Sequence, residues 1–261
     1  MSASPVYQIG PLAVRVPCYP HARLRGLLRQ PTAVAAQAML ELEIVDRPDW
    51  VSTLERGGNT FLKALTSHQC RIDFAERRVQ LRLAADLDET GWYFGFRDLF
   101  AGLCALSGDA FLHASSVVHN GEATAFCAYS GGGKSTIAHL LGGDANTIND
   151  EINWAFRDAT GRFRLVDQRF YRVPQTSPCP DLPLAGICLL VQAPTCAVSP
   201  ADALTAYPIV LAAPFGNDPC LPQRAATAAA LFAHVPIRRL EFNLVPSEIR
   251  AALGWENPAD A

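Results

Sequence analysis

A run of glycines followed by a lysine and two hydroxyl side chains is the stretch of this chain whose residue types most directly suggest chemistry. It consists of Ser130, Gly131, Gly132, Gly133, Lys134, Ser135 and Thr136. Consecutive glycines leave backbone N–H groups free to curl round an anion. Lys134 can reach the β- and γ-phosphates of a nucleotide, and the Ser135 hydroxyl can ligate Mg²⁺. The pattern predicts a nucleotide phosphate-binding loop of the Walker A type.

The consensus for such a loop is G-x-x-x-x-G-K-[ST], and the chain departs from it only at the first glycine, which is Ala128. Alanine is small enough to make the turn if its φ is negative. The alternative is a flexible surface turn with no ligand. The flanking sequence favours the loop, because Thr124 to Cys127 predicts a strand before it and the apolar residues from Ile137 to Leu141 predict a helix after it. The N-terminus of that helix would point at the phosphates.

Two acids and a histidine fall where phosphoryl transfer would need them. Asp150 and Glu151 follow the predicted strand Asn146 to Ile148, whose end faces the phosphates in a doubly wound arrangement. One acid could hold Mg²⁺ and the other could accept a proton from an attacking hydroxyl. A solvated turn is the alternative for such a pair. His113 could approach the transferred phosphate or orient an acid, or it could be structural.

The elements that position these residues are indicated by hydrophobic periodicity. Asn120-Gly121 between two apolar runs is a strong hairpin signal. Apolar residues at helical spacing predict an amphipathic helix over 92–106. Further along we expect a hairpin over 152–166, a buried strand over 184–191, a helix with Ser199 as N-cap and Pro200 as its first residue, a helix over 222–234, a strand over 235–242 and a helix over 246–253.

The first part of the chain is predicted to be rich in strands. Strand signals cover 6–9, 12–16, 40–44, 71–74 and 79–83, and turn signals mark 46–50 and 56–59 as loops. We therefore predict a β-rich N-terminal layer over 1–90 and a nucleotide-binding core over 91–261, together one compact unit. The proline-rich segment 174–183 is predicted to be a loop that could border the active site.

Composition limits the class of protein. The formal net charge is −3, and basic residues are scattered and nearly matched by acids, so no nucleic-acid partner is indicated. No apolar run is long enough for a membrane span, and the first residues lack a signal pattern. We expect a soluble, cytoplasmic protein. None of the 8 cysteines forms a C-x-x-C pair, and reduced core cysteines are favoured over disulfides or a zinc site.

The order and spacing of several stretches resemble the HPr kinase/phosphorylase family. They are Leu112 to Ser115, Asn120-Gly121, Ser130 to Thr136 and Asp150-Glu151. That family shares its P-loop core with ATP-dependent phosphoenolpyruvate carboxykinase. The resemblance covers residues 110 to 157, and it is closer still to the short HPr-kinase-like proteins found beside genes for ribosomally made, modified peptides. Some of these phosphorylate a serine of a lasso-peptide precursor.

The resemblance implies a fold and a set of roles. The fold is α/β, with a P-loop core on a mixed sheet, here preceded by the β-rich layer. The amides of the glycine-rich loop and Lys134 would bind the phosphates of ATP, and Ser135 would bind Mg²⁺. Asp150 would act as general base on the substrate hydroxyl with His113 nearby. Glu151 would help with metal or substrate, and Asp150 could also reach the metal.

The family usually has Asp where this chain has Glu151, which moves that carboxylate outward by one methylene. Arg169, Arg172 and Arg224 are candidates for an arginine that stabilises the transferred phosphate, and the sequence does not choose among them. A homo-oligomer is also implied by the resemblance.

The first hypothesis is an ATP- and Mg²⁺-dependent kinase that phosphorylates a serine hydroxyl of a peptide or protein. The second is a small-molecule kinase, for example one acting on free serine. The third is a nucleotide-binding module that has lost transfer activity, for which Ala128 and Glu151 would be early signs.

Overall fold

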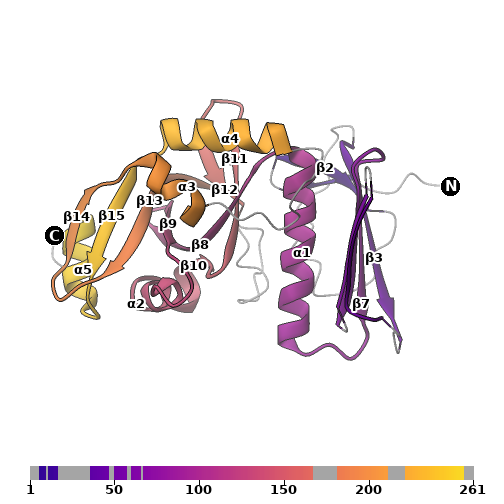
Figure 1. The fold of residues 1–261 in the computed structure, drawn as a ribbon, viewed down its shortest axis with the longest axis horizontal. Coiled ribbons are helices and arrows are strands. Elements are labelled where there is room, and N and C mark those ends of the chain that lie inside the picture. Colours follow the sequence, from indigo (N-terminus) through magenta and orange to yellow (C-terminus); the bar gives the residue numbers. More distant parts are fainter. Residues whose placement is uncertain are drawn as a thin grey trace. The chain divides into compact units, whose positions relative to one another are not determined.

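The computed structural model describes residues 6–9, 11–16, 36–46, 50–57, 60–65, 67–166, 181–210 and 221–255. They form a mixed α/β fold with two mixed sheets (Figure 1). They divide into two compact units. The first runs to Asp109 and includes residues 221–225, and the second holds the rest from Ala110 onward. This division places the helix predicted over 92–106 with the N-terminal sheet, whereas the sequence boundary was drawn before that helix.

The first unit is built on a seven-stranded sheet in the order β1-β2-β3-β7-β6-β5-β4. Its strands are β1 (Val6–Ile9), β2 (Leu12–Arg15), β3 (Ala38–Val45), β4 (Thr53–Gly57), β5 (Thr60–Ala64), β6 (His68–Asp73) and β7 (Arg78–Ala84). The strands alternate between buried and more accessible residues, as Leu40 and Leu42 alternate with Glu41 and Glu43 in β3. This alternation leaves one apolar face to be covered.

The apolar face of that sheet is covered by helix α1 (Glu89–Ser107), which packs on β6 and β7 (Figure 1). Asp88 caps the helix by accepting the Gly91 N–H over 2.7 Å. The helix ends where Gly108 takes φ 77, a left-handed conformation that glycine adopts without steric cost. The predicted amphipathic helix is therefore confirmed. It begins earlier than predicted, at Glu89, directly after the cap Asp88.

The second unit is built on an eight-stranded mixed sheet. Its strands are β8 (Ala110–His119), β9 (Glu122–Cys127), β10 (Thr147–Asn149), β11 (Ile152–Arg157), β12 (Phe163–Leu165), β13 (Leu182–Gln192), β14 (Ala197–Pro200) and β15 (Ile237–Phe242). The helices are α2 (Lys134–Asn146), α3 (Ala203–Val210), α5 (Pro246–Leu253) and, from residue 226 onward, α4 (Leu221–His234). Helix α2 lies against β8, β9 and β10, while β9, β13 and β15 run parallel.

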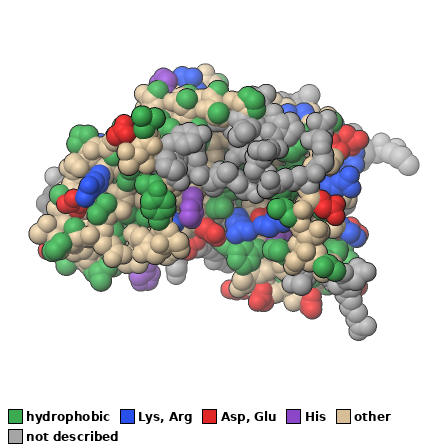
Figure 2. All heavy atoms as spheres, in the orientation of Figure 1, with side chains coloured by type: hydrophobic (Ala, Val, Ile, Leu, Met, Phe, Trp, Pro, Cys, Tyr) green, Lys and Arg blue, Asp and Glu red, His purple; other side chains and the backbone are tan. Residues whose placement is uncertain are grey.

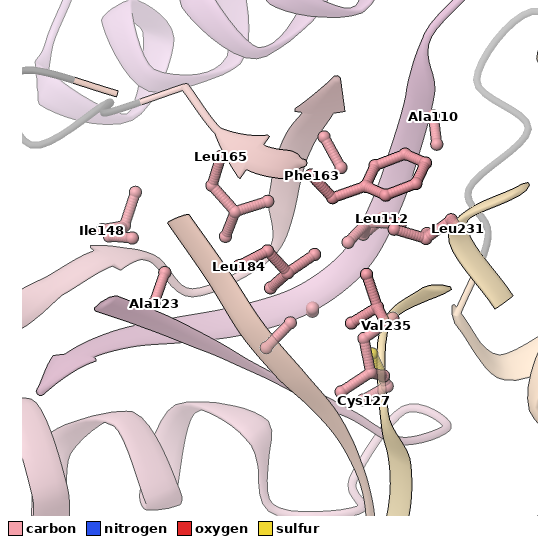
Figure 3. Packing of buried hydrophobic residues seen from close by; sticks show 14 of the residues in the cluster. Ala110, Leu112, Ala123, Cys127, Ile148, Phe163, Leu165, Leu184, Leu231 and Val235 are labelled. Carbon is pink, nitrogen blue, oxygen red and sulfur yellow. The ribbon is translucent and has the colours of Figure 1, made fainter. Parts of the chain in front are cut away.

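Strand pairings in this unit close on themselves. β8 pairs with β9 and β11, β11 pairs with β12, and β13 joins β12 to β9. The closed ring surrounds small and branched side chains such as Ala123, Leu112 and Leu184, and Leu231 of α4 packs against the same cluster (Figure 3). Alanines at this core allow the strands to approach closely. Residues of β8 and β9 thus contribute directly to the apolar core of this unit.

The doubly wound arrangement that was predicted around Asp150 and Glu151 is wrong. Both β9 and β10 pair with β8 antiparallel, so β10 runs in the same direction as β9 with β8 between them. The crossover through α2 therefore passes over one antiparallel strand. Because β9 and β10 share a direction, their carboxyl ends still meet at one edge of the sheet.

Most of the predicted elements are present. The Asn120-Gly121 hairpin, the hairpin of β11 and β12, the strand β13, and the helices α4 and α5 are confirmed. The predicted helix start at Ser199 and Pro200 is wrong, because these residues pair with β15 as part of the edge strand β14. An edge strand accommodates proline. Helix α3 begins after it, and Asp202 accepts the Thr205 N–H over 3.0 Å.

Two of the predicted loops differ from the structure in their bounds or lie largely outside the described residues. The loop predicted over 56–59 is too long, because β4 extends to Gly57 and pairs with β5. Strands β4 and β5 were missed because their alternation is weak. The proline-rich loop predicted over 174–183 lies largely outside the described residues, and β13 already begins at Leu182.

The described surface carries both charges. Figure 2 shows basic and acidic side chains interspersed on the viewed face of the described residues. None of the described helices is both long and apolar enough to cross a membrane. Cysteines within the described ranges are free thiols, four of them buried. Burial raises the pKa of Cys188 to about 12 and raises that of Cys70 and Cys127 as well, so these thiols stay protonated.

Candidate functional site

The glycine-rich loop connects the carboxyl end of β9 to the N-terminus of α2, as the motif requires. Gly131 has φ 78 and Gly133 has φ 95, a region that side chains with a Cβ rarely adopt. Gly132 is needed for a different reason, because a Cβ there would lie 2.5 Å from the Cβ of Ala128. Gly131 and Gly133 are thus needed for their positive φ, and Gly132 is needed because the loop has no room for a Cβ there.

Ala128, the departure from the consensus, fits this loop. It is 5% exposed and does not have a positive φ, so the condition set by the sequence is met. Its methyl group packs against Gly132, and the Gly132 N–H donates to the Tyr129 carbonyl over 3.0 Å. The alanine therefore closes the turn from the buried side without distorting it.

The Lys134 side chain stabilises the start of the glycine-rich loop by hydrogen bonds to its backbone. Its Nζ donates to the carbonyl oxygens of Ala128 at 2.9 Å and Tyr129 at 3.4 Å. An ammonium group has three donors, and these carbonyls hold it over the start of the loop. The lysine charge is therefore fixed beside the loop amides, where it can attract an anion.

The N-terminus of α2 has properties of an anion site. Its N-cap is Gly133, no side chain caps it, and its first turn holds no acidic residue. The hydroxyl residues Ser135 and Thr136 are exposed there. Backbone N–H groups of a first helical turn have no partner within the helix, and the helix dipole adds positive potential. The start of α2 thus combines unpartnered helix amides with two exposed hydroxyl side chains and one lysine.

Strand β8 lies between the glycine-rich loop and the acids Asp150 and Glu151, and it contacts both segments. The Ser115 hydroxyl, fully buried, donates to the Lys134 carbonyl oxygen over 2.8 Å. On one edge of β8, Ala114 lies opposite Cys127, the last residue of β9. On the other edge the Ala114 N–H donates to the Glu151 carbonyl over 3.0 Å. One residue of β8 therefore separates the start of the loop from the acidic pair.

Asp150 and Glu151 form the short break between β10 and β11. Asn149 lies opposite Ser116 and Ile152 lies opposite His113, so the two acids run alongside the middle of β8. The buried Asn149 side chain shapes the break, since its Oδ1 accepts the Glu151 N–H at 2.9 Å and the Ile152 N–H at 3.0 Å. Both acids are half-buried. The backbone of this break is therefore held by the Asn149 side chain.

His113 lies within electrostatic reach of both the loop and the acids. Its pKa is lowered chiefly by burial and further by the charge of Lys134, while the charge of Glu151 opposes this and raises it. The imidazole is therefore neutral at neutral pH and can accept a proton or a hydrogen bond. Three residues predicted from the sequence, one from each of three segments, are thus brought together at one edge of the sheet.

The metal ligands predicted from sequence do not form a preassembled cluster. No group of three or more His, Cys, Asp or Glu side chains suited to a metal occurs in the part of the chain that the structure describes. Mg²⁺ in phosphoryl-transfer sites is commonly held by one or two carboxylates together with substrate phosphates and waters. The donor set of Ser135, Asp150 and Glu151 fits that mode rather than an all-protein cage.

The arginines proposed from the sequence fall outside what the structure describes. Arg169 and Arg172 lie outside the described residues, and the side chain of Arg224 does too. Arg239 of β15 lines a cavity beside Ala128 and Tyr129, although no sequence motif marks it. Ser115 and Asn149 were also missed, because a hydroxyl or an amide within a strand carries no signal until its partner is known.

A second polar constellation lies in the first unit, where sequence reasoning found no catalytic residues. Ser67 Oγ lies 3.0 Å from His68 Nδ1, and His68 Nε2 lies 2.9 Å from Asp98 Oδ2. Lys63 Nζ also contacts the Asp98 carboxylate at 2.7 Å. His68 is fully buried and Asp98 is 3% exposed, so a substrate cannot reach them. This arrangement joins α1 to the sheet and is structural.

Comparisons with known proteins add no assignment to this geometry. No family model matches the chain, and no curated protein matches it either.

Proposed function

We propose that the chain is an ATP- and Mg²⁺-dependent kinase that phosphorylates a serine hydroxyl of a peptide or protein. The observation that carries the proposal is the convergence of the glycine-rich loop, His113 and the Asp150-Glu151 break on the two edges of β8. Phosphoryl transfer depends on positioning and charge stabilisation, and these groups supply both.

The loop would hold the phosphates of the nucleotide. The N-terminus of α2 offers backbone N–H groups that have no partner within the helix, and Lys134 adds a positive charge that is already held in place by loop carbonyls. Donors fixed before the reaction need no reorganisation as charge develops on the transferred group. Lys134 would thus stabilise the bridging and γ-phosphate oxygens.

The acids and His113 would serve the acceptor. By resemblance to the HPr kinase/phosphorylase family, Asp150 takes the proton from the attacking hydroxyl. Glu151 acts electrostatically on His113, which stays neutral and can orient the acceptor by a hydrogen bond. Mg²⁺, held by Ser135 and one of the acids, would neutralise phosphate charge.

The resemblance also supplies the class of acceptor. Short HPr-kinase-like proteins include kinases that modify a serine of a peptide precursor, and we propose the same core fold and the same class of acceptor for this chain. The shared residues lie within the second unit, from His113 to Glu151. A free amino-acid acceptor would need the same phosphate chemistry, so the acceptor must be found by assay.

The test is a transfer assay with γ-labelled ATP and Mg²⁺. Free serine, HPr and any precursor peptide encoded beside the gene are offered as acceptors. We expect label on a serine of the peptide or protein acceptor. Binding of ATP with no label on any acceptor would contradict the kinase assignment and leave a nucleotide-binding module.

A further inference from the structure

A cavity of about 320 Å³ lies beside the first residues of the glycine-rich loop. It lies within the second unit, between the carboxyl ends of β9 and β13 and helix α3. Ligands of parallel sheets bind outside the carboxyl ends of the strands. Its volume falls in the range of small-molecule sites. Its lining includes Cys127, Tyr129, Leu189, Asp202, Thr205 and Arg239.

A single row of side chains forms one wall of this cavity. Leu189 of β13 lies opposite Cys127 on one edge and opposite Arg239 on the other. Residues directly opposite in adjacent strands project from the same face of a sheet. The row therefore presents a thiol, an isobutyl group and a guanidinium to the same space, in that order from the loop outward.

The polar groups at the rim are already partnered within the protein. Asp202 Oδ2 accepts the Thr205 N–H at 3.0 Å and the Thr205 hydroxyl at 3.1 Å. Arg239 Nη2 donates to Glu241 Oε1 at 2.8 Å. One donor of the guanidinium is therefore engaged while its flat face remains able to stack. An occupant gains most from this cavity by being flat and largely apolar.

Tyr129 supplies a second flat surface at the entrance. It follows Ala128 in the loop, lines the cavity and is 65% exposed. Its carbonyl oxygen accepts the Gly132 N–H, so the backbone that carries the ring is part of the phosphate loop itself. A ligand whose anionic end binds the loop would meet this ring next.

The side on which the cavity lies indicates which part of the reaction it serves. His113 in β8 and Glu151 beyond it lie on one side of β9, whereas the cavity lies on the other side, toward β13. Attacking and leaving oxygens are roughly in line in phosphoryl transfer. If the acceptor hydroxyl approaches from the side of the acids, the nucleoside diphosphate must leave toward β13.

We propose that this cavity binds the nucleobase of the phosphate donor, held between the Tyr129 ring and the Arg239 guanidinium over the floor of Leu189. The assignment rests on the proposed function, because it takes the phosphates to lie in the glycine-rich loop. Stacking on a ring and a guanidinium accepts any base with a π-face. The cavity therefore favours a purine by contact area rather than by a hydrogen-bond code.

The test compares two ligands of the intact chain by calorimetry: MgATP and magnesium tripolyphosphate, which lacks base and ribose. The wild type should bind MgATP at least about tenfold more tightly. Tyr129→Ala and Arg239→Ala should each weaken MgATP roughly five- to tenfold and leave tripolyphosphate unchanged. Arg238→Ala is the matched control, since Arg238 precedes Arg239 in β15, pairs with Cys188 and is equally exposed.

The outcomes separate this proposal from the proposed function. Equal affinity of the wild type for both ligands would overturn the base site while leaving phosphate binding intact. MgATP affinity that is unchanged in both variants, or weakened to the same extent as tripolyphosphate affinity, would overturn it too. Failure of the wild type to bind either ligand would overturn the proposed function, and the base site with it.

Discussion

The Ser115 hydroxyl donates to the carbonyl oxygen of Lys134 over 2.8 Å, and this bond fastens the central strand of the site to the first residue of the helix behind the glycine-rich loop. Ser115 is fully buried, so water cannot replace it. The same strand carries His113 and runs beside Glu151. The bond therefore couples the position of the loop to that of the residues proposed to act on the acceptor.

Ser115→Ala tests that coupling. Loss of one hydrogen bond should lower the free energy of unfolding by about 1 kcal/mol and weaken MgATP binding by up to about fivefold. Ser116→Ala is the control, because the buried Ser116 hydroxyl has no hydrogen-bond partner among the described residues. That change should be neutral or stabilising. Urea denaturation and calorimetry measure both quantities, and equal effects of the two changes would contradict the role given to Ser115.

Gly132→Ala tests the space that the loop needs. Its new Cβ would lie 2.5 Å from the Cβ of Ala128, so the turn must open and MgATP affinity should fall at least about tenfold. Ala128→Gly, added to it, removes the opposing methyl group and should restore part of the affinity. The single change Ala128→Gly should bind normally. A double variant that binds no better than Gly132→Ala would show that the contact with Ala128 is not what matters.

The titration of His113 tests the charges around it. Burial and the Lys134 charge lower its pKa, while Glu151 raises it. The pKa should thus lie below the ordinary value of about 6.5. Glu151→Gln should lower it further, and Lys134→Met should raise it. Proton NMR of the His113 ring measures these values without activity, and shifts of the opposite sign would refute the proposed arrangement.

Asp98 is predicted to anchor α1 to the first sheet. Burial alone would raise the pKa of Asp98, but hydrogen bonds from His68 and Lys63 and the Lys63 charge lower it overall. Its stabilisation is therefore complete above the unfolded pKa of about 3.9 and is lost as pH falls through the lower folded value. Asp98→Ala should cost about 3 kcal/mol at neutral pH and reduce the acid sensitivity.

Urea denaturation at neutral and acid pH checks the Asp98 prediction. Glu43→Ala is a suitable control, because the Glu43 side chain is 53% exposed and its ion pair with Arg82 should be worth less than about 1 kcal/mol. A cost for Asp98→Ala no larger than that of Glu43→Ala would contradict the structural role of the buried network.

Local signals in the sequence were sufficient where neighbours in the chain decide the structure. Asn120 and Gly121 take φ 51 and 78, the left-handed turn that this pair predicts. Helix α5 spans the predicted residues 246–253, since Pro246 can start a helix and Gly254 can end one. The strand, loop and helix around Lys134 were predicted for the same reason.

Local sequence signals did not predict the structure where pairing between residues far apart in the chain decides it. Ser199 and Pro200 have the local pattern of a helix start, but pairing with Arg239 and Arg238 makes them a strand. The row that brings Cys127, Leu189 and Arg239 together joins three strands far apart in sequence. The hydrogen bond from Ser115 to Lys134 could not be predicted from the sequence either, because a serine in a strand has many possible partners.

Asp150→Asn measured for both binding and transfer tests the central claim most directly. The change removes a proton acceptor and keeps the size of the side chain, so MgATP affinity should remain within about threefold of the wild type while transfer of label to serine falls at least about a hundredfold. Glu151→Gln, measured beside it, shows which acid takes the proton. Transfer at the wild-type rate in both variants would contradict the proton-acceptor role given to the acids, and no transfer by the wild type despite tight MgATP binding would contradict the kinase assignment.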